Sequence, residues 1–161
     1  MTRTILVLLM MVSSTAFAAD KLGPYAGLGV GVSYVEVDPR DRTVVGAHLD
    51  LGYRYTAYLA TEGSIGISEA RNSDVTAYSA AISVLPMLPV SEDMDIFLAF
   101  SYSVATSNDF LEVDRDIEDG FGVGIGFIHH MDNIYVRGRV STPFSDAADA
   151  VGVGLDLGFK F

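Results

Sequence analysis

Residues 151–161 read VGVGLDLGFKF, and this two-residue alternation decides the fold class. The odd-numbered side chains are all apolar, whereas the even-numbered positions hold glycine, Asp156 and Lys160. A period of two residues is that of a β-strand, because successive side chains of a strand point to opposite faces. The stretch therefore predicts a strand whose two faces meet different surroundings.

The same alternation recurs along the rest of the chain, interrupted by turn-rich segments, and no stretch after Tyr25 has a convincing helical period. Strands of about 10 residues rise roughly 33 Å, and at a tilt near 40° they cover an apolar band about 25 Å tall. An even number of such strands permits closure with both ends of the chain on one side. We predict strands near residues 25–34, 43–55, 58–68, 75–85, 95–104, 119–128, 133–141 and 150–161.

The glycines indicate which face is turned inward. All 16 except Gly23, Gly63 and Gly138 lie on the polar faces of the predicted strands. On a solvated face, as in a soluble lipocalin-like barrel, these glycines would only weaken the sheet. In the narrow lumen of an eight-stranded barrel they leave room for close-packed side chains. No residue that we assign to the apolar face is charged, and a charge at the bilayer midplane costs about 2–4 kcal/mol. We therefore predict an all-β fold, a closed eight-stranded antiparallel transmembrane β-barrel.

Composition narrows the function classes. The chain has 161 residues, which suits one domain, and 50% of them are hydrophobic, which excludes disorder. Ten basic residues against 21 acidic ones give a net charge of −11, which disfavours nucleic acid as a partner. The absence of cysteine excludes disulfides, thiolate metal sites and cysteine nucleophiles. We expect no cofactor.

The first residues have the pattern of a signal peptide. Arg3 precedes the apolar run 5–12, and Ala16-Phe17-Ala18 is a small-residue cleavage motif. The alternative is a buried N-terminal helix. We predict a Sec-type signal peptide over residues 1–19, cleaved after Ala18 or Ala19, and a barrel domain over residues 20–161.

Aromatic side chains are expected at both rims of such a barrel, where the lipid headgroups lie. With both ends of the chain in the periplasm, one set gathers at the periplasmic rim and another at the outer rim. The first set is Tyr53, Tyr55, Phe127, Phe159 and Phe161, and the second is Tyr34, Tyr78, Phe100, Tyr102 and Phe121.

The signal-peptide pattern, the amphipathic strands and the final Gly158-Phe159-Lys160-Phe161 resemble the small Gram-negative outer-membrane barrels. The types that they resemble are the OmpA transmembrane domain, OmpX and the opacity-type outer membrane protein beta-barrel domains. This resemblance implies that the chain resides in the outer membrane. It also implies that Phe159 and Phe161 present an assembly signal to the barrel-assembly machinery.

The inward faces carry both acidic and basic residues, and unpaired charges in a low-dielectric lumen are costly. If the turn after Tyr55 is tight, Asp50 lies roughly opposite Glu62, and we expect Arg137 or Arg139 to reach across to this pair. The resemblance also implies a luminal cluster of acids with an arginine, for which Glu62 and Arg137 are suitably placed. The alternative is that these groups only fill the lumen. The predicted luminal charge network is Asp50, Glu62, Arg137, Arg139, Asp156 and His48, with Arg54 and Lys160 also inward.

A catalytic function is the weakest of the alternatives. His48 and Asp50 share a face, and several serines point inward, but nucleophilic catalysis needs serine, histidine and acid within hydrogen-bond reach. Outer-membrane enzymes that modify lipid A use such groups near the outer rim, where this sequence has no histidine. His129 and His130 are expected in the turn before Asp132. We predict that the protein is not an enzyme.

The predicted outer loops, 35–43, 68–74, 105–119 and 142–149, hold 13 of the 21 acidic residues. Asp114, Asp116, Glu118 and Asp119 hint at a cation-binding loop, although Gly120 and Ile125 do not fit a calcium-binding EF-hand. Such a loop could bridge divalent cations to lipopolysaccharide phosphates. The alternative is a solvated, repulsive crown.

We therefore expect an integral outer-membrane barrel with a structural role in the envelope and a largely plugged lumen of low or no conductance. The alternatives are a surface-interaction barrel, adhesive or host-factor-binding, and, less favoured, a lipid A-modifying enzyme. The expected partners are outer-membrane lipid, lipopolysaccharide and the barrel-assembly machinery, with the barrel a monomer.

Overall fold

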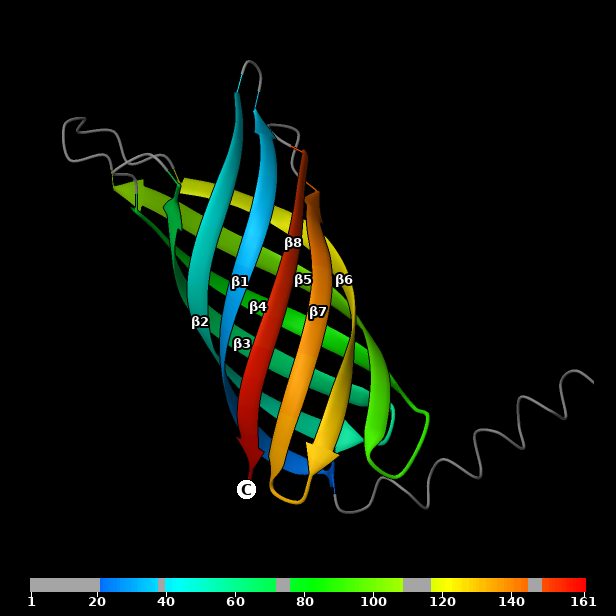
Figure 1. Ribbon diagram of the computed structural model, residues 1–161. Helices are drawn as coiled ribbons and strands as arrows, with labels where there is room; N and C mark the ends of the chain where they lie inside the picture. The colour runs from blue at the N-terminus through cyan, green and yellow to red at the C-terminus, as the bar shows by residue number, and fades with distance from the viewer. Residues whose placement is uncertain (1–20, 38–39, 72–75, 109–116, 145–148) are drawn as a thin grey trace, which may run out of the picture.

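A computed structural model describes residues 21–37, 40–71, 76–108, 117–144 and 149–161. It is a closed barrel in which each strand pairs antiparallel with the next and the last pairs with the first, as Figure 1 shows. The predicted fold class is confirmed. The eight strands are β1 (Gly23–Val37), β2 (Arg40–Thr56), β3 (Leu59–Ala70), β4 (Thr76–Pro89), β5 (Met94–Asn108), β6 (Ile117–Met131), β7 (Ile134–Phe144) and β8 (Asp149–Lys160).

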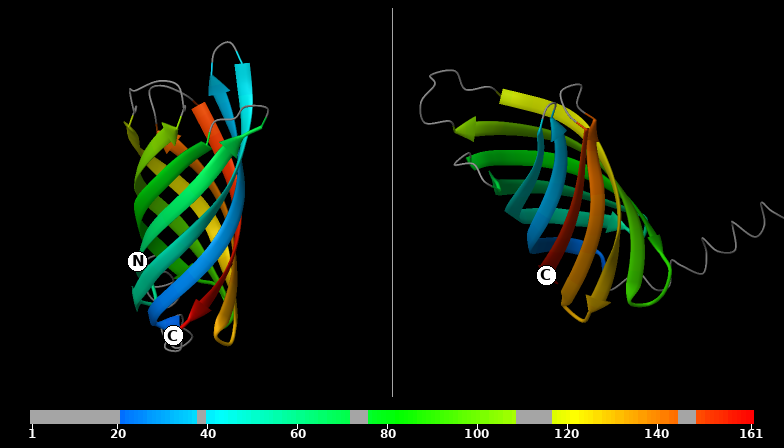
Figure 2. Two further views of the ribbon diagram at one scale, coloured as in Figure 1. Left: turned by 90° about the vertical axis from the view of Figure 1, so that its left-hand side faces the viewer. Right: turned by 45° about the horizontal axis from the view of Figure 1, so that its top comes forward.

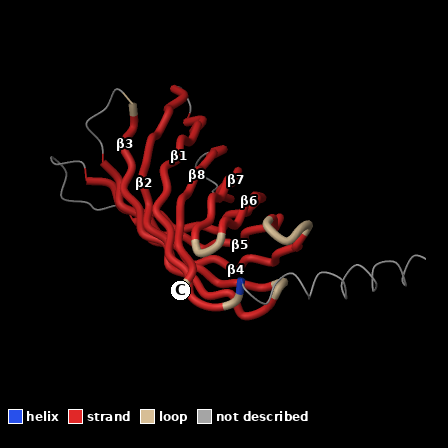
Figure 3. The backbone as a smooth tube through the Cα atoms, turned by 60° about the horizontal axis from the view of Figure 1, so that its bottom comes forward, coloured by secondary structure: helices blue, strands red, loops and turns tan. Residues whose placement is uncertain are grey.

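Almost all of the described backbone is strand, with short turns at one end, as Figure 3 shows. No helix among the described residues has the length and apolarity that a membrane span requires.

The strands have from 11 residues in β7 to 17 in β2, and all except β8, which keeps its predicted length of 12 residues, are longer than predicted. The sequence pattern marks only the stretch in which one face must be apolar, whereas ladder hydrogen bonds continue wherever two backbones stay paired. Several acids that we predicted to lie in loops are therefore strand residues. They are Glu36, Asp41, Glu69, Glu118, Asp119 and Asp149.

Both ends of the described chain lie at the same end of the barrel, which we call the terminal rim; the opposite end is the loop rim. Tyr25 pairs with Lys160, and the Phe161 amide donates a hydrogen bond to the Pro24 carbonyl at 3.1 Å. Figure 2 shows the start of β1 beside the end of β8. At the loop rim, β1 and β2 rise beyond the other strands in Figure 1.

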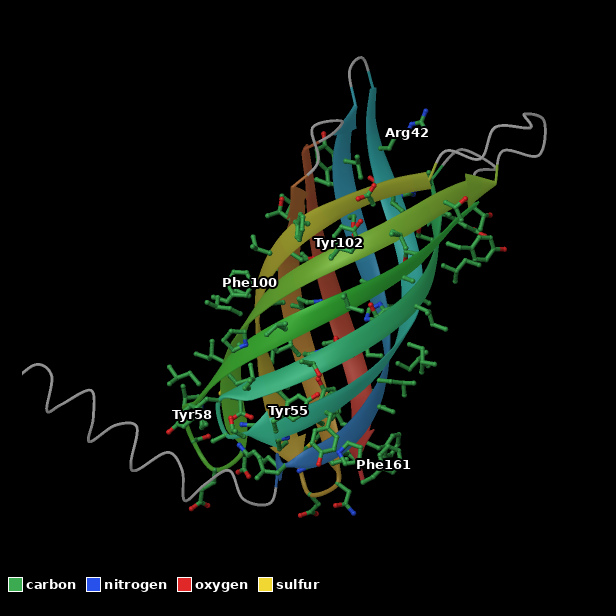
Figure 4. All side chains as sticks on the ribbon, turned by 180° about the vertical axis from the view of Figure 1, so that it is seen from behind. Arg42, Tyr55, Tyr58, Phe100, Tyr102 and Phe161 are labelled. Atoms are coloured by element: carbon green, nitrogen blue, oxygen red, sulfur yellow. The ribbon has the colours of Figure 1, made fainter. Side chains whose placement is uncertain are left out.

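The apolar side chains point outward. Leu28 is 65% exposed and Ile82 is 68% exposed, as expected of side chains that face lipid. The aromatic residues predicted for the two rims are all exposed. Figure 4 shows Tyr55 and Phe161 near one end of the barrel and Tyr102 toward the other.

Ring contacts join neighbours within each rim set. The ring centroids of Tyr53 and Tyr55 are 5.0 Å apart, and those of Tyr102 and Phe121 are 5.1 Å apart. Two acids, Glu69 and Asp119, are exposed on strands near the loop rim, on the same strand face as Ile67 and Phe121 respectively. The charge-free outer face thus ends short of that rim.

The half of the lumen nearer the terminal rim is filled. A small apolar core includes Leu85, Phe97 and Tyr135. Glycines on the facing strands make this packing feasible, because a Cβ at Gly27 or Gly158 would collide with the Tyr135 side chain. The glycine pattern in the sequence thus corresponds to seats for bulky luminal side chains.

Candidate functional site

The six residues of the predicted luminal network lie together inside the barrel. Asp50 and His48 come from β2, Glu62 from β3, Arg137 and Arg139 from β7 and Asp156 from β8; we call this group the mid-lumen cluster. Each points inward because strand alternation places it on the face opposite the exposed apolar residues.

Arg137 is the centre of the mid-lumen cluster and is fully buried. Its Nε donates to Asp156 Oδ2 at 2.5 Å, Nη1 donates to Glu62 and Nη2 donates to Asp50. Tyr25 adds a hydrogen bond from its hydroxyl to Glu62 Oε2 at 3.2 Å. One guanidinium thus links carboxylates from three strands, a geometry to which its planar fork of donors is suited.

The prediction that Asp50 lies roughly opposite Glu62 is wrong, because the strand register differs from the expected one. Asp50 pairs with Ser64, and Glu62 pairs with Gly52, so the two acids are diagonal neighbours. A register irregularity between Arg54 and Thr56 shifts the pairing of β2 with β3 by one residue. The diagonal offset keeps the two carboxylates from facing each other directly, and both accept from Arg137.

His48 and Arg139 complete the cluster on the side toward the loop rim. His48 Nε2 lies 2.6 Å from Asp156 Oδ1 and 3.4 Å from Asp50 Oδ2. The contacts of Arg139 are longer: 3.5 Å from Nη2 to His48 Nε2, and 3.8 Å from Nη1 to Glu62 Oε1.

His48, Asp50 and Asp156 are of ligand type and close enough together to hold a metal ion. Arg137 donates to both of these carboxylates, however, and Arg139 lies beside the imidazole. The positive charges of these two arginines, next to the three candidate ligands, oppose the binding of a metal cation.

A second charged group lies at the terminal rim, and the sequence reasoning did not find it as a group. Asp95 is fully buried and accepts from Arg54 Nη1 at 2.5 Å, contacts His130 Nε2 at 2.7 Å, and pairs with Lys21 Nζ at 3.2 Å. We call Lys21, Arg54, Asp95 and His130 the floor cluster. Arg54 also donates from Nη2 to the Ala57 carbonyl at 2.6 Å.

The predicted position of the two adjacent histidines, His129 and His130, is wrong. His129 and His130 were expected in a turn, but β6 runs to Met131 and the turn is at Asp132, which has a positive φ of 53°. His130 points inward and is buried, whereas His129 is exposed. The two-residue alternation of a strand is a signal for this cluster, because it places Asp95 on the same inward face as Phe97 and Ala99.

An apolar layer separates the two clusters. Tyr25 and Tyr135 meet edge to face, with ring centroids 5.9 Å apart, and Tyr135 packs with the core that includes Phe97. Ion pairs and buried side chains together close the terminal half of the lumen.

Of the four residues of the predicted cation loop, Asp114 and Asp116 lie outside the described residues. Glu118 and Asp119 belong to β6, and Asp119 accepts a hydrogen bond from the Tyr102 hydroxyl at 2.6 Å. The predicted signal peptide also lies outside the described residues. The aromatic side chains proposed as the assembly signal, Phe159 and Phe161, are exposed.

Comparison with known proteins gives consistent results. The family model for the outer membrane protein beta-barrel domain matches residues 4–161. A search among curated proteins finds no match.

Several solved structures share the fold. The Neisserial surface protein A has a TM-score of 0.70 at 14% identity, covering 86% of this chain and 97% of its own. The attachment invasion locus protein Ail of Yersinia pestis has a TM-score of 0.63 at 15% identity, covering 87% and 99%. The outer membrane enzyme PagL has a TM-score of 0.54 at 12% identity, covering 84% and 99%. At these identities the likeness concerns the fold alone.

Proposed function

Because this chain belongs to the outer membrane protein beta-barrel domain family, we propose that it is an integral barrel of the Gram-negative outer membrane with a structural role in the envelope. One observation carries the proposal: Arg137 joins three luminal carboxylates in a fully buried cluster. Water-filled barrels have 16 or more strands, whereas eight strands enclose only enough room for packed side chains. The barrel thus provides a lipid-facing wall without an open channel.

The partners follow from this arrangement. The terminal rim faces the periplasm and the loop rim faces the exterior. The exposed apolar wall contacts outer-membrane lipid and lipopolysaccharide, and the barrel functions as a monomer. Phe159 and Phe161, on and after β8, are the groups offered to the barrel-assembly machinery. The first residues act as the cleaved export signal.

Single-channel recording of protein refolded in planar bilayers tests the closed lumen. We expect no stable openings in the wild type, and higher conductance in Glu62→Ala, which removes one of the carboxylates that hold Arg137. Glu92→Ala, in an exposed turn, is the matched control and should behave as wild type. Stable, large openings in the wild type would refute the proposal.

We propose further that the barrel is not an enzyme, although PagL shares its fold. His48 is engaged with Asp156 inside the lumen, away from the lipid face where lipid A would be modified. His130 is engaged with Asp95 at the terminal rim. The lipid A mass spectrum should be unchanged when the gene is deleted. A lost or gained acyl chain would contradict this proposal.

Surface interaction is the second candidate, and the strand ends favour it. β2 has 17 residues, more than the lipid band needs, so β1 and β2 form a projection at the loop rim (Figure 1). Binding of cells that display the wild type should fall on deletion of this projection and persist on deletion of the β3–β4 connection. Equal binding by both variants would count against a role for the projection.

A further inference from the structure

The lumen between the mid-lumen cluster and the loop rim is not filled. It holds a cavity of about 250 Å³. His48 and Arg139 form the end of the cavity that is nearest the mid-lumen cluster. Hydroxyl-bearing side chains from four strands line the wall: Ser33, Ser68, Ser79 and Ser141. Most of the other lining residues are glycines. We call this cavity the vestibule.

Glycines create the space into which these hydroxyls point. A Cβ at Gly152 would lie 2.8 Å from Ser33 Oγ and 3.6 Å from Ser141 Oγ, and one at Gly66 would lie 2.9 Å from Ser79 Oγ. Within the described part of the chain, none of the four lining serine hydroxyls has a protein hydrogen-bond partner. Their donors and acceptors are therefore available to water or to a ligand.

Arg139 differs from the other two luminal arginines. All three donor groups of Arg137 reach carboxylates, and those of Arg54 reach Asp95 and backbone carbonyls. Among the described residues, Arg139 has only a 3.5 Å contact to His48 and a 3.8 Å ion pair to Glu62, and its side chain is 20% exposed. The guanidinium of Arg139 thus keeps donors free to bind a carboxylate, and it lies at the inner end of a polar cavity.

We propose that the vestibule binds a small hydroxylated carboxylate, of the size and chemistry of a sugar acid, entering from the loop rim. Arg139 receives the carboxylate and the serines receive the hydroxyls. The cavity is smaller than the roughly 300–1,000 Å³ of pockets for drug-sized ligands, which limits the ligand to about one sugar ring. The carboxylates of the mid-lumen cluster lie behind Arg139, so a doubly charged anion is disfavoured and a cation meets the guanidinium first.

Nuclear magnetic resonance of the barrel refolded in lipid nanodiscs tests the proposal with glucuronate as the probe. Glucose, which has the ring without the carboxylate, is the matched neutral ligand. We expect saturable shifts of the Ser33, Ser141 and Gly152 amides with glucuronate, at a dissociation constant near the millimolar range, and at least tenfold weaker binding of glucose. No saturable shift, or equal shifts with the two sugars, would overturn the proposal.

Variants locate the site. Arg139→Gln should weaken glucuronate binding at least tenfold, while Arg139→Lys, which keeps the charge without the fork, should have an intermediate effect. Arg42→Gln, at an exposed position near the loop rim, should bind as wild type. Unchanged binding by Arg139→Gln would overturn the assignment.

Ser141→Val provides an independent test should Arg139→Gln fail to refold. It removes one hydroxyl and adds volume within the vestibule, so glucuronate binding should be lost while the heat-dependent gel mobility of the folded barrel is retained. Undiminished binding by a folded Ser141→Val protein would place the ligand elsewhere. The outcome is separate from the conductance test, because the vestibule lies on the loop-rim side of the closure.

Discussion

The two luminal charge clusters have opposite composition. In the mid-lumen cluster, one buried cation, Arg137, serves three carboxylates. In the floor cluster, one buried carboxylate, Asp95, serves Lys21, Arg54 and His130. Each cluster therefore depends on a single central residue.

The atoms left without partners differ in kind between the two clusters. Among the described residues, Asp50 Oδ1 and Glu62 Oε1 have no hydrogen-bond partner in the mid-lumen cluster, and His130 Nδ1 has none in the floor cluster. The first cluster thus leaves carboxylate oxygens without donors, whereas the second leaves only a ring nitrogen without a partner and keeps both oxygens of Asp95 engaged. Burial makes an unmatched charge costly, so the two clusters should respond differently to the loss of their central residue.

The largest expected effect comes from Arg137→Met. This change leaves three carboxylates facing one another in the lumen, and breaking buried ion pairs in this way costs about 3–5 kcal/mol. Urea titration of the barrel in lipid vesicles measures the free energy of unfolding. Arg42→Met, an exposed position, is the control. A loss below about 1 kcal/mol would mean that the cluster is not what holds the lumen together.

Asp95→Asn should have a smaller effect, about 1–3 kcal/mol in the same titration. The bases left behind have alternatives: Arg54 keeps its carbonyl partners, and Lys21 lies at the rim, from which its ammonium can turn toward water. Asp93→Asn, in the neighbouring exposed turn, should change little. A loss as large as that of Arg137→Met would show that the contrast between the clusters is wrong.

The smallest expected effect is the energetic coupling between the clusters, which is the difference between the stability lost by the double variant and the sum of the single losses. They share no ion-pair partner among the described residues, and Phe97 and Tyr135 pack in the layer that separates them. The combined variant Arg137→Met/Asp95→Asn should therefore lose the sum of the single losses, within about 0.5 kcal/mol. If the double variant is too unstable to titrate, Glu62→Gln with Asp95→Asn serves instead. A coupling above about 1 kcal/mol would indicate one network rather than two.

The sequence predicted the barrel well because lipid and lumen impose opposite requirements on alternate residues. The outward Val153, Leu155 and Leu157 and the inward Gly152, Gly154 and Asp156 follow from period alone. Strand ends were less predictable. Beyond the lipid band the outward face tolerates polar residues, so Glu69 and Asp119 were assigned to loops although the ladder continues through them.

The members of the mid-lumen cluster were predictable, but their contacts were not. Parity places Asp50, Glu62 and Arg137 inside, whereas their relative heights depend on register. The irregularity beside Thr56 shifts that register and has no sequence mark. The floor cluster was missed for another reason: β6 extends past Ile128, so His130 is an inward strand residue rather than a turn residue.

The pairing of β1 with β8 also determines when the barrel can close. Tyr25 and Lys160, at one end of this seam, are partners almost a whole chain length apart. Until β8 has been synthesised, β1 has no partner on one edge, and an unpaired edge can recruit other chains. Such long-range pairing is slow to form. The barrel therefore cannot close until its last strand has been made, and until then one edge of β1 stays unpaired.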